Sequence, residues 1–168
     1  MRERGFTLIE LVLVLLVATV VGIVVSTNLS GFPTIKVNGA ARKLASDIRF
    51  AQQMAITQQV KYGVAVNVPV ANKYTVYKND DPTVPARDPA GGNNFIVDFT
   101  TGQFQGVTLS STLPVDGSAR KLVKFDSQGQ PLGGGGSALA GPNNTITLSY
   151  SGATAVVTIA PTTGRVTY

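Results

Sequence analysis

A long apolar run near the N-terminus constrains this chain more than any other feature of its sequence. Residues 6–25 read FTLIELVLVLLVATVVGIVV, which is 20 residues with one charged side chain, Glu10. As an α-helix the run would be about 30 Å long, the thickness of the hydrocarbon core of a bilayer. A single segment in lipid can satisfy its backbone polar groups only as a helix. The run therefore predicts a transmembrane helix at 6–25.

The flanking residues indicate how this helix is used. Arg2 and Arg4 precede the run, so the positive-inside rule places the N-terminus in the cytoplasm and the bulk of the chain outside. A cleaved secretory signal would have a shorter apolar core and a small-residue cleavage site, whereas Ser26, Thr27 and Asn28 follow this run. A plain membrane anchor would have no use for the acid inside the span.

Glu10 is therefore the residue that distinguishes these interpretations. A carboxylate inside an apolar span costs up to ~3 kcal/mol at the midplane on insertion scales, and less near the edge. The span holds no Lys or Arg. A cationic partner for Glu10 must therefore come from another molecule or from a new α-amino group.

Residues 4–11, RGFTLIEL, resemble the class III signal of type IV pilins and type II secretion pseudopilins. The resemblance implies that residues 1–5 are a leader, that a prepilin peptidase cleaves between Gly5 and Phe6, and that Phe6 is then N-methylated. Cleavage would create an ammonium group four residues from Glu10. In a filament, the amine of one subunit could neutralise Glu10 of its neighbour. Such a pair would mostly fix register, because desolvation offsets its Coulomb gain.

The pattern changes after the apolar run. Residues 26–38 contain Gly31 and Pro33, which predict a kinked connector, and Asn38 could cap a new helix. At 39–60 apolar residues recur with helical spacing, which predicts an amphipathic helix covered by a sheet. The apolar stripe comprises Ala41, Leu44, Ala45, Ile48, Ala51 and Ala55, and the polar face Arg42, Lys43, Asp47, Arg49, Gln52 and Gln53. A second apolar pair, Phe50 and Met54, is interpreted as packing residues rather than a cofactor site.

Beyond Lys61 the apolar period becomes two, which is typical of strands. Strands are predicted at 62–68, 73–78, 95–99, 102–109, 120–125, 145–150, 153–159 and 164–168. One long N-terminal helix followed by antiparallel strands is an α+β arrangement. This layout resembles the pilin fold, in which the long helix packs on antiparallel β-sheet. Residues 39–168 would then form a periplasmic globular domain.

A finer resemblance lies within this layout. Helix 41–56 running into strand 62–68, the stretch FDSQG at 125–129, and the closing segments 156–159 and 163–166 look like the GspH/FimT group of minor pseudopilins. The resemblance implies a non-enzymatic subunit of a type II secretion pseudopilus, which supports export of folded proteins through an outer-membrane secretin. Its partners would be other pseudopilins in a helical filament, the prepilin peptidase and the inner membrane, which it crosses once. A minor subunit of a type IV pilus is the alternative.

Composition excludes several kinds of active site. The chain has no Cys and no His, which excludes disulfides, thiol catalysis, zinc ribbons and a Ser-His-Asp triad. Asp80, Asp81 and Asp88 lie in one loop and could offer oxygen ligands to Ca²⁺. Their spacing fits no EF-hand, and a solvated acidic loop is the favoured interpretation. A phosphate cradle at the glycines 133–136 would lack its lysine and helix. We expect no catalytic residue, metal or cofactor.

The formal net charge of +5 raises the question of a nucleic-acid partner. Arg120, Lys121, Lys124 and Arg165 could form a patch for DNA phosphates. FimT-type minor pilins, which resemble this chain, bind DNA through a C-terminal Gly-Arg-x-Arg. Here residues 164–167 read GRVT, without the second arginine. DNA binding in natural transformation and a merely solubilising surface both stay open.

Overall fold

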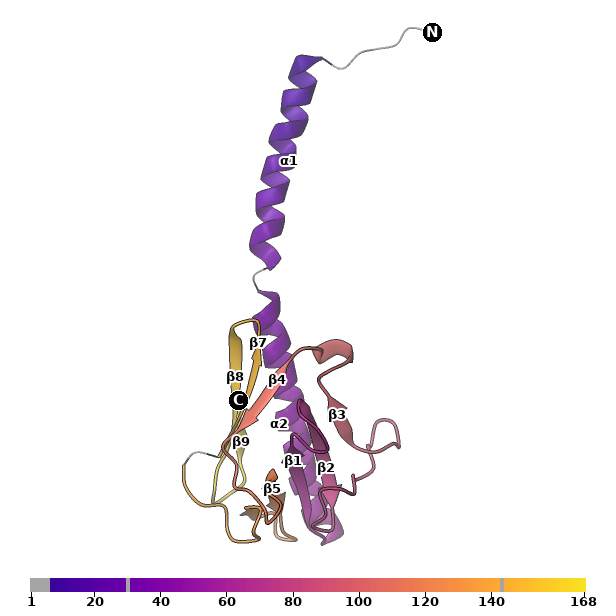
Figure 1. Cartoon of the computed structure of the whole chain (residues 1–168), viewed down its shortest axis with the longest axis vertical. Coiled ribbons are helices and arrows are strands. Elements are labelled where there is room, and N and C mark those ends of the chain that lie inside the picture. The colour runs from indigo at the N-terminus through magenta and orange to yellow at the C-terminus, as the bar shows by residue number, and fades with distance from the viewer. Residues whose placement is uncertain (1–6, 30, 143) are drawn as a thin grey trace. The chain divides into compact units, whose positions relative to one another are not determined.

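Two helices make up the N-terminal third of the chain (Figure 1). The structure is a computed structural model that describes residues 7–29, 31–142 and 144–168. The chain divides into two compact units, Met1–Pro33 and Thr34–Tyr168. Helix α1 (Leu8–Leu29) lies in the first unit, and helix α2 (Phe32–Gln58) starts at the end of that unit and continues through the second.

The interruption between α1 and α2 is much shorter than the connector predicted at 26–38. Helix α1 continues to Leu29, and α2 already begins at Phe32. Pro33 is the second residue of α2, and proline is tolerated in a first turn because its missing N–H has no intrahelical acceptor there. Asn38 consequently lies inside α2 instead of capping it.

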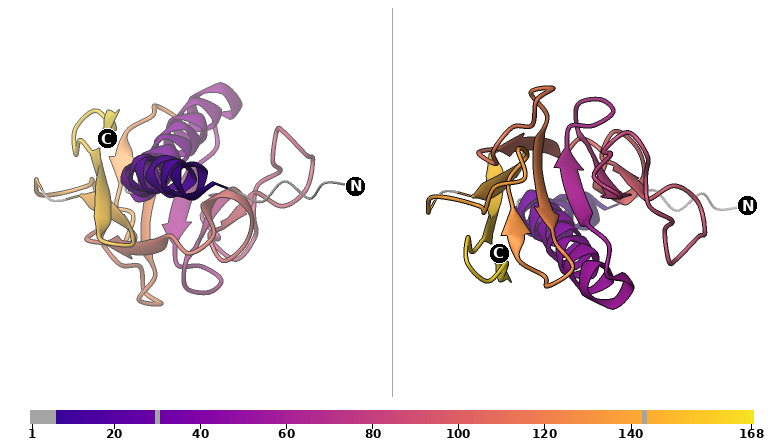
Figure 2. Two further views of the ribbon diagram at one scale, coloured as in Figure 1. Left: turned by 90° about the horizontal axis from the view of Figure 1, so that it is seen from above. Right: turned by 90° about the horizontal axis from the view of Figure 1, so that it is seen from below.

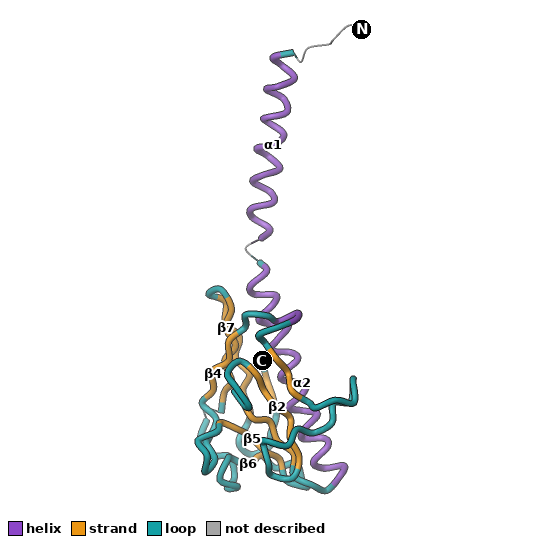
Figure 3. Tube along the Cα trace, turned by 45° about the vertical axis from the view of Figure 1, so that its right-hand side comes forward, coloured by secondary structure: helices purple, strands orange, loops and turns teal. Residues whose placement is uncertain are grey.

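Helix α2 buries one apolar stripe against the sheets. All six residues predicted for the stripe are buried, which confirms the helical spacing, and Val37 and Ala40 extend it toward the N-terminus. Five residues of this stripe are alanines, which are small enough for the large side chains of the sheets to lie close to the helix. Figure 3 shows the strands gathered beside α2.

Within the described residues nine strands form two antiparallel sheets, and Figure 2 shows strands of both beside α2. The five-stranded sheet has the order β3 (Ile96–Asp98), β2 (Lys73–Lys78), β1 (Tyr62–Val66), β5 (Lys121–Phe125) and β6 (Pro131–Leu132). The four-stranded sheet has the order β4 (Thr108–Ser111), β7 (Thr145–Tyr150), β8 (Ala153–Ile159) and β9 (Val166–Thr167). Neighbouring strands are antiparallel throughout.

Both sheets contribute to one core with α2. The apolar cluster that contains the α2 stripe also holds fully buried side chains from both sheets. The five-stranded sheet and the turn after β3 contribute Tyr74, Phe125 and Phe99, and β7 of the four-stranded sheet contributes Ile146 and Leu148. The result is the predicted α+β arrangement of a helix on antiparallel sheets.

The strand predicted at 102–109 is replaced by a short 3-10 helix, η1 (Gly102–Phe104), followed by β4. Gly102 and Gly106 have φ angles of +71° and +87°. These left-handed conformations suit glycine and interrupt an extended strand. Strand β6, with two residues, was not predicted from the sequence.

Candidate functional sites

The first turn of α1 contains Glu10, the one charged residue of the apolar run. The backbone N–H of Glu10 lies 3.1 Å from the carbonyl oxygen of Thr7 and 3.4 Å from its hydroxyl oxygen. Thr7 and Glu10 have the spacing of a capping box, and a carboxylate at a helix N-terminus also interacts favourably with the helix dipole. Glu10 is exposed. The predicted cleavage residues, Gly5 and Phe6, lie outside the described residues.

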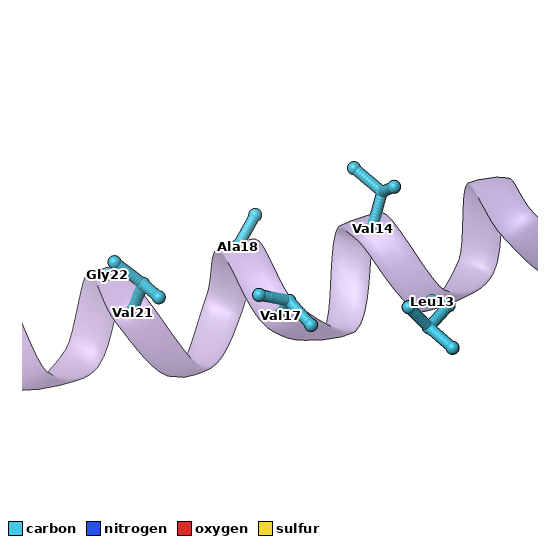
Figure 4. A pocket seen from close by; sticks show the side chains of 6 residues that line it. All are labelled: Leu13, Val14, Val17, Ala18, Val21 and Gly22. Atoms are coloured by element: carbon cyan, nitrogen blue, oxygen red, sulfur yellow. The ribbon is translucent and has the colours of Figure 1, made fainter.

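The apolar side chains of α1 face outward along its length. Residues 8–23 are all exposed, and Leu8 is 83% exposed. One face forms a shallow groove of about 680 Å³, lined by Leu13, Val14, Val17, Ala18, Val21 and Gly22 (Figure 4). Ala18 and Gly22 are four residues apart, the spacing of small residues that lets two helices approach closely. This face can therefore contact another apolar helix or lipid.

Among the helices of the described residues, none combines the length and the apolarity that crossing a membrane requires.

Of the candidate DNA-binding residues, Lys121 and Lys124 lie on β5, and Arg120 directly precedes that strand. Arg120 and Lys124 form ion pairs with Asp116 at 2.7 Å and Asp80 at 2.6 Å, respectively. Lys121, the first residue of β5, donates a hydrogen bond to the carbonyl oxygen of Ser111. Three of the four cations thus have acceptors within the described chain.

Arg165, the fourth candidate, is exposed in the turn between β8 and β9 of the other sheet. DNA binding by these four residues stays a prediction, and the structure pairs two of them with carboxylates.

Two carboxylates of the acidic loop after β2 have partners within the chain. Asp80 also forms an ion pair with Lys61 at 2.8 Å. Burial would raise the pKa of Asp80, but hydrogen bonds from Lys124 and Lys61 outweigh burial and hold the pKa below its ordinary value. Asp81 accepts hydrogen bonds from Thr83. Across the described part of the chain, no group of three metal-ligating side chains is placed to hold an ion.

A buried polar network, not predicted from the sequence, joins α2 to the five-stranded sheet. Asp47 is 5% exposed, and its carboxylate accepts hydrogen bonds from Lys43 Nζ and from the hydroxyl of Tyr74 on β2, each at 2.6 Å. Burial raises the pKa of Asp47, although the bonds from Lys43 and Tyr74 oppose that rise. Burial also raises the pKa of Tyr74, and the neighbouring Asp47 adds to the effect. The helical spacing of apolar residues in the sequence predicted Asp47 on the polar face of this helix.

Gln52 connects α2 to two distant turns. Its Nε2 donates to the carbonyl oxygens of Gly129, at 2.9 Å, and Thr163, at 3.1 Å. A Cβ on Gly129 would lie 2.7 Å from Ile56, and one on Gly164 would lie 2.7 Å from Gln52. The motifs at 125–129 and 163–166 therefore hold both turns against α2.

Comparisons with known proteins agree with this architecture. The family model of Type II transport protein GspH matches residues 40–163, and the Prokaryotic N-terminal methylation motif matches residues 1–26. Type II secretion system protein H of Klebsiella pneumoniae is 33% identical over 98 residues, which cover 56% of this chain and 55% of that protein. The chain thus spans about half the length of this curated relative.

A solved structure shows the same fold. The type IV minor pilin FimU of Pseudomonas aeruginosa superposes with a TM-score of 0.51 at 16% identity, over 78% of this chain and 86% of that one. This likeness confirms the predicted pilin fold. Because the match to GspH extends over residues 40–163, well over half of the chain, the protein belongs to the GspH family of type II transport proteins.

Proposed function

We propose that this protein is a minor pseudopilin of a type II secretion system, a structural subunit that supports export of folded proteins across the outer membrane. The observation that carries the proposal is the succession of two matches on one chain, the methylation motif at 1–26 and GspH at 40–163. A minor pilin of a type IV pilus is the second candidate, and the likeness in fold to FimU favours it.

The proposed pathway begins with insertion of the apolar run into the inner membrane. Arg2 and Arg4 keep the leader in the cytoplasm, which leaves the globular domain in the periplasm. Prepilin peptidase then cleaves between Gly5 and Phe6, and Phe6 is methylated. The subunit finally leaves the lipid for a helical filament of pseudopilins. The exposed apolar face of α1 supports this last step, because it can exchange lipid contacts for contacts with neighbouring helices.

Glu10 is proposed to guide assembly. After cleavage, the amino group of Phe6 on one subunit would meet the carboxylate of Glu10 on the next. Within the described residues Glu10 forms no ion pair, and Thr7 supplies only a local cap at its backbone N–H. The side chain of Glu10 is therefore accessible to a partner on another subunit.

Deletion of the gene tests the proposal, with secretion and piliation measured in the same strain. We expect folded exoproteins to accumulate in the periplasm while surface pili persist, and the full chain supplied in trans to restore secretion. Loss of pili with normal secretion would favour the type IV pilus candidate.

Mass spectrometry of the mature protein should find methylated Phe6 as its first residue, and any other first residue would contradict the proposed processing.

A further inference from the structure

Phe50 and Met54, the second apolar pair of α2, line a pocket of about 440 Å³. They are only partly buried, in contrast to the stripe that the sheets cover. With Gln58 they occupy successive turns of α2, and Tyr62 at the start of β1 completes this side of the pocket. Helix α2 therefore has a second apolar surface that the fold leaves partly open.

The opposite wall of the pocket is a segment of the long loop between β2 and β3. Two buried residues anchor this loop: Ala86 N–H donates to the carbonyl oxygen of Val76 at 2.7 Å, and Phe95 N–H donates to that of Ala86 at 2.8 Å. Asp88 N–H donates to the carbonyl oxygen of Asn93, also at 2.7 Å. The Phe95 ring lies 5.8 Å from the Phe50 ring. The wall is thus held in place by the protein's own bonds, which lowers the ordering cost of binding a partner.

The polar side chains that line the pocket are mostly engaged in hydrogen bonds within the chain. Gln58 Oε1 accepts hydrogen bonds from the hydroxyl of Tyr62, at 2.8 Å, and from Lys78 Nζ, at 2.9 Å. Arg87 uses Nε to donate to the carbonyl oxygen of Gly92 at 2.8 Å. The ion pairs of the described residues do not include Arg87. Arg87 and Asp88 thus both line the pocket, and Lys78, bonded to Gln58, adds a second cation next to it.

We propose that this pocket binds a bulky apolar side chain of a partner polypeptide, with an acidic residue beside that side chain contacting Arg87. The apolar lining comprises the rings of Phe50 and Tyr62, the thioether of Met54 and the ring of Pro89, and methionine adapts to side chains of different shape. A buried apolar anchor surrounded by polar contacts is the usual arrangement of a strong protein–protein contact. The lining is mainly apolar, with Arg87 and Asp88 as its charged groups, which suits an apolar side chain better than a small polar ligand. The proposal holds for either filament.

Met54 provides a specific probe for this pocket. The chain has two methionines, Met1 and Met54, so a sample labelled with [methyl-13C]methionine has one internal methionine signal. The Met54→Leu variant, which keeps an apolar side chain, assigns that signal by removing it. The full chain in non-ionic detergent is titrated with four acetylated dipeptide amides: Phe-Glu, Phe-Gln, Phe-Lys and Ala-Glu.

We expect Phe-Glu to shift the Met54 signal saturably and Ala-Glu to leave it unchanged. Phe-Gln should bind about 1.4- to 5-fold more weakly, since an exposed ion pair contributes about 0.2–1 kcal/mol. Arg87→Gln should abolish the difference between Phe-Glu and Phe-Gln. Arg165→Gln, which removes the same charge from an exposed turn elsewhere, should preserve that difference.

Three results would overturn the proposal. Absence of a saturable shift with Phe-Glu and Phe-Gln would exclude an apolar anchor. A preference for Phe-Lys would assign the rim to Asp88 and exclude an acidic partner. Binding of free phenylalaninamide as tight as that of Phe-Glu would assign the pocket to a small aromatic molecule instead of a polypeptide.

Discussion

Helix α1 exposes its apolar side chains from residue 8 to residue 23, whereas α2 buries an apolar stripe under two sheets. The acid on each helix follows the same division. Glu10 on α1 is exposed, while Asp47 on α2 is buried and bonded to Lys43 and Tyr74. The apolar stripe and the buried acid of α2 thus both find their partners within the chain. The exposed apolar side chains of α1 have no such cover within the described residues, and a contiguous apolar surface of this size is unfavourable in water.

The largest expected effect concerns assembly through Glu10. In Glu10→Gln the side chain can still serve a capping box, which accepts Glu or Gln, but it cannot form the proposed ion pair with a neighbour's amine. An amine left buried without its partner costs about 3–5 kcal/mol. We therefore expect normal insertion and cleavage on gels, but loss of the variant from sheared filaments.

Thr7→Val serves as the control for this experiment, since it removes the capping hydroxyl and keeps the charge of Glu10. It should enter filaments normally. If Glu10→Gln assembles as well as the natural protein, capping alone would account for Glu10 and the intermolecular pair would be wrong.

The second prediction compares one substitution on both helices. Leu44 is completely buried in α2, so Leu44→Ala should lower the free energy of unfolding by about 2–5 kcal/mol. Leu13 is 61% exposed on α1, so Leu13→Ala should leave that free energy unchanged. Urea unfolding of the full chain in detergent, followed by near-ultraviolet circular dichroism of the tyrosines, measures both. Equal losses for the two variants would contradict the division between the helices.

Local periodicity explains why the covered stripe of α2 could be predicted from the sequence. Ala41, Leu44 and Ile48 follow the helical repeat, and burial under a sheet requires only that repeat. The RGFTLIEL segment and the apolar run also carried the family resemblance within a few consecutive residues. Patterns of this kind need no knowledge of which distant segments meet.

Features that depend on distant partners were not predictable in this way. Asp47 bonds to a tyrosine 27 positions away, and Gln52 bonds to turns 77 and 111 positions away. Both residues were therefore placed on a polar surface by the repeat alone. Lys124 was assigned to a DNA-binding patch because its partner Asp80, 44 positions away, could not be identified from spacing.

The third prediction tests the polar link between α2 and β2 with two tyrosines of the same strand. Tyr74→Phe removes the hydroxyl that bonds Asp47 and should cost about 1–3 kcal/mol, because a buried carboxylate loses a donor. Tyr77 has a buried hydroxyl without a hydrogen-bond partner among the described residues. Tyr77→Phe should accordingly be neutral or slightly stabilising. The same urea titration decides, and a larger loss for Tyr77→Phe would refute this assignment.

The smallest expected effect is a loss of stability of the globular unit on acidification. Hydrogen bonds from Lys73 and Thr100 lower the pKa of Asp98 to about 2, and Asp80, Asp81 and Asp116 also have lowered pKa values. A carboxyl group whose pKa is lower in the folded state stabilises the fold above its unfolded pKa. That contribution is lost as the pH falls from about 4 toward 2.

Asp47 acts in the opposite direction, because its pKa is raised and its contribution is lost as the pH rises. Four carboxyl groups with lowered pKa values act against one with a raised pKa. The urea midpoint should therefore decrease as the pH is lowered from 5 to about 2.5, where most of these carboxyl groups become protonated. Asp98→Asn should reduce that fall, because its ion pair with Lys73, at 2.7 Å, is then absent at every pH. A urea midpoint that rises on acidification would mean that Asp47 determines the pH dependence. The ion pairs of the loops would then contribute little to the stability of the globular unit.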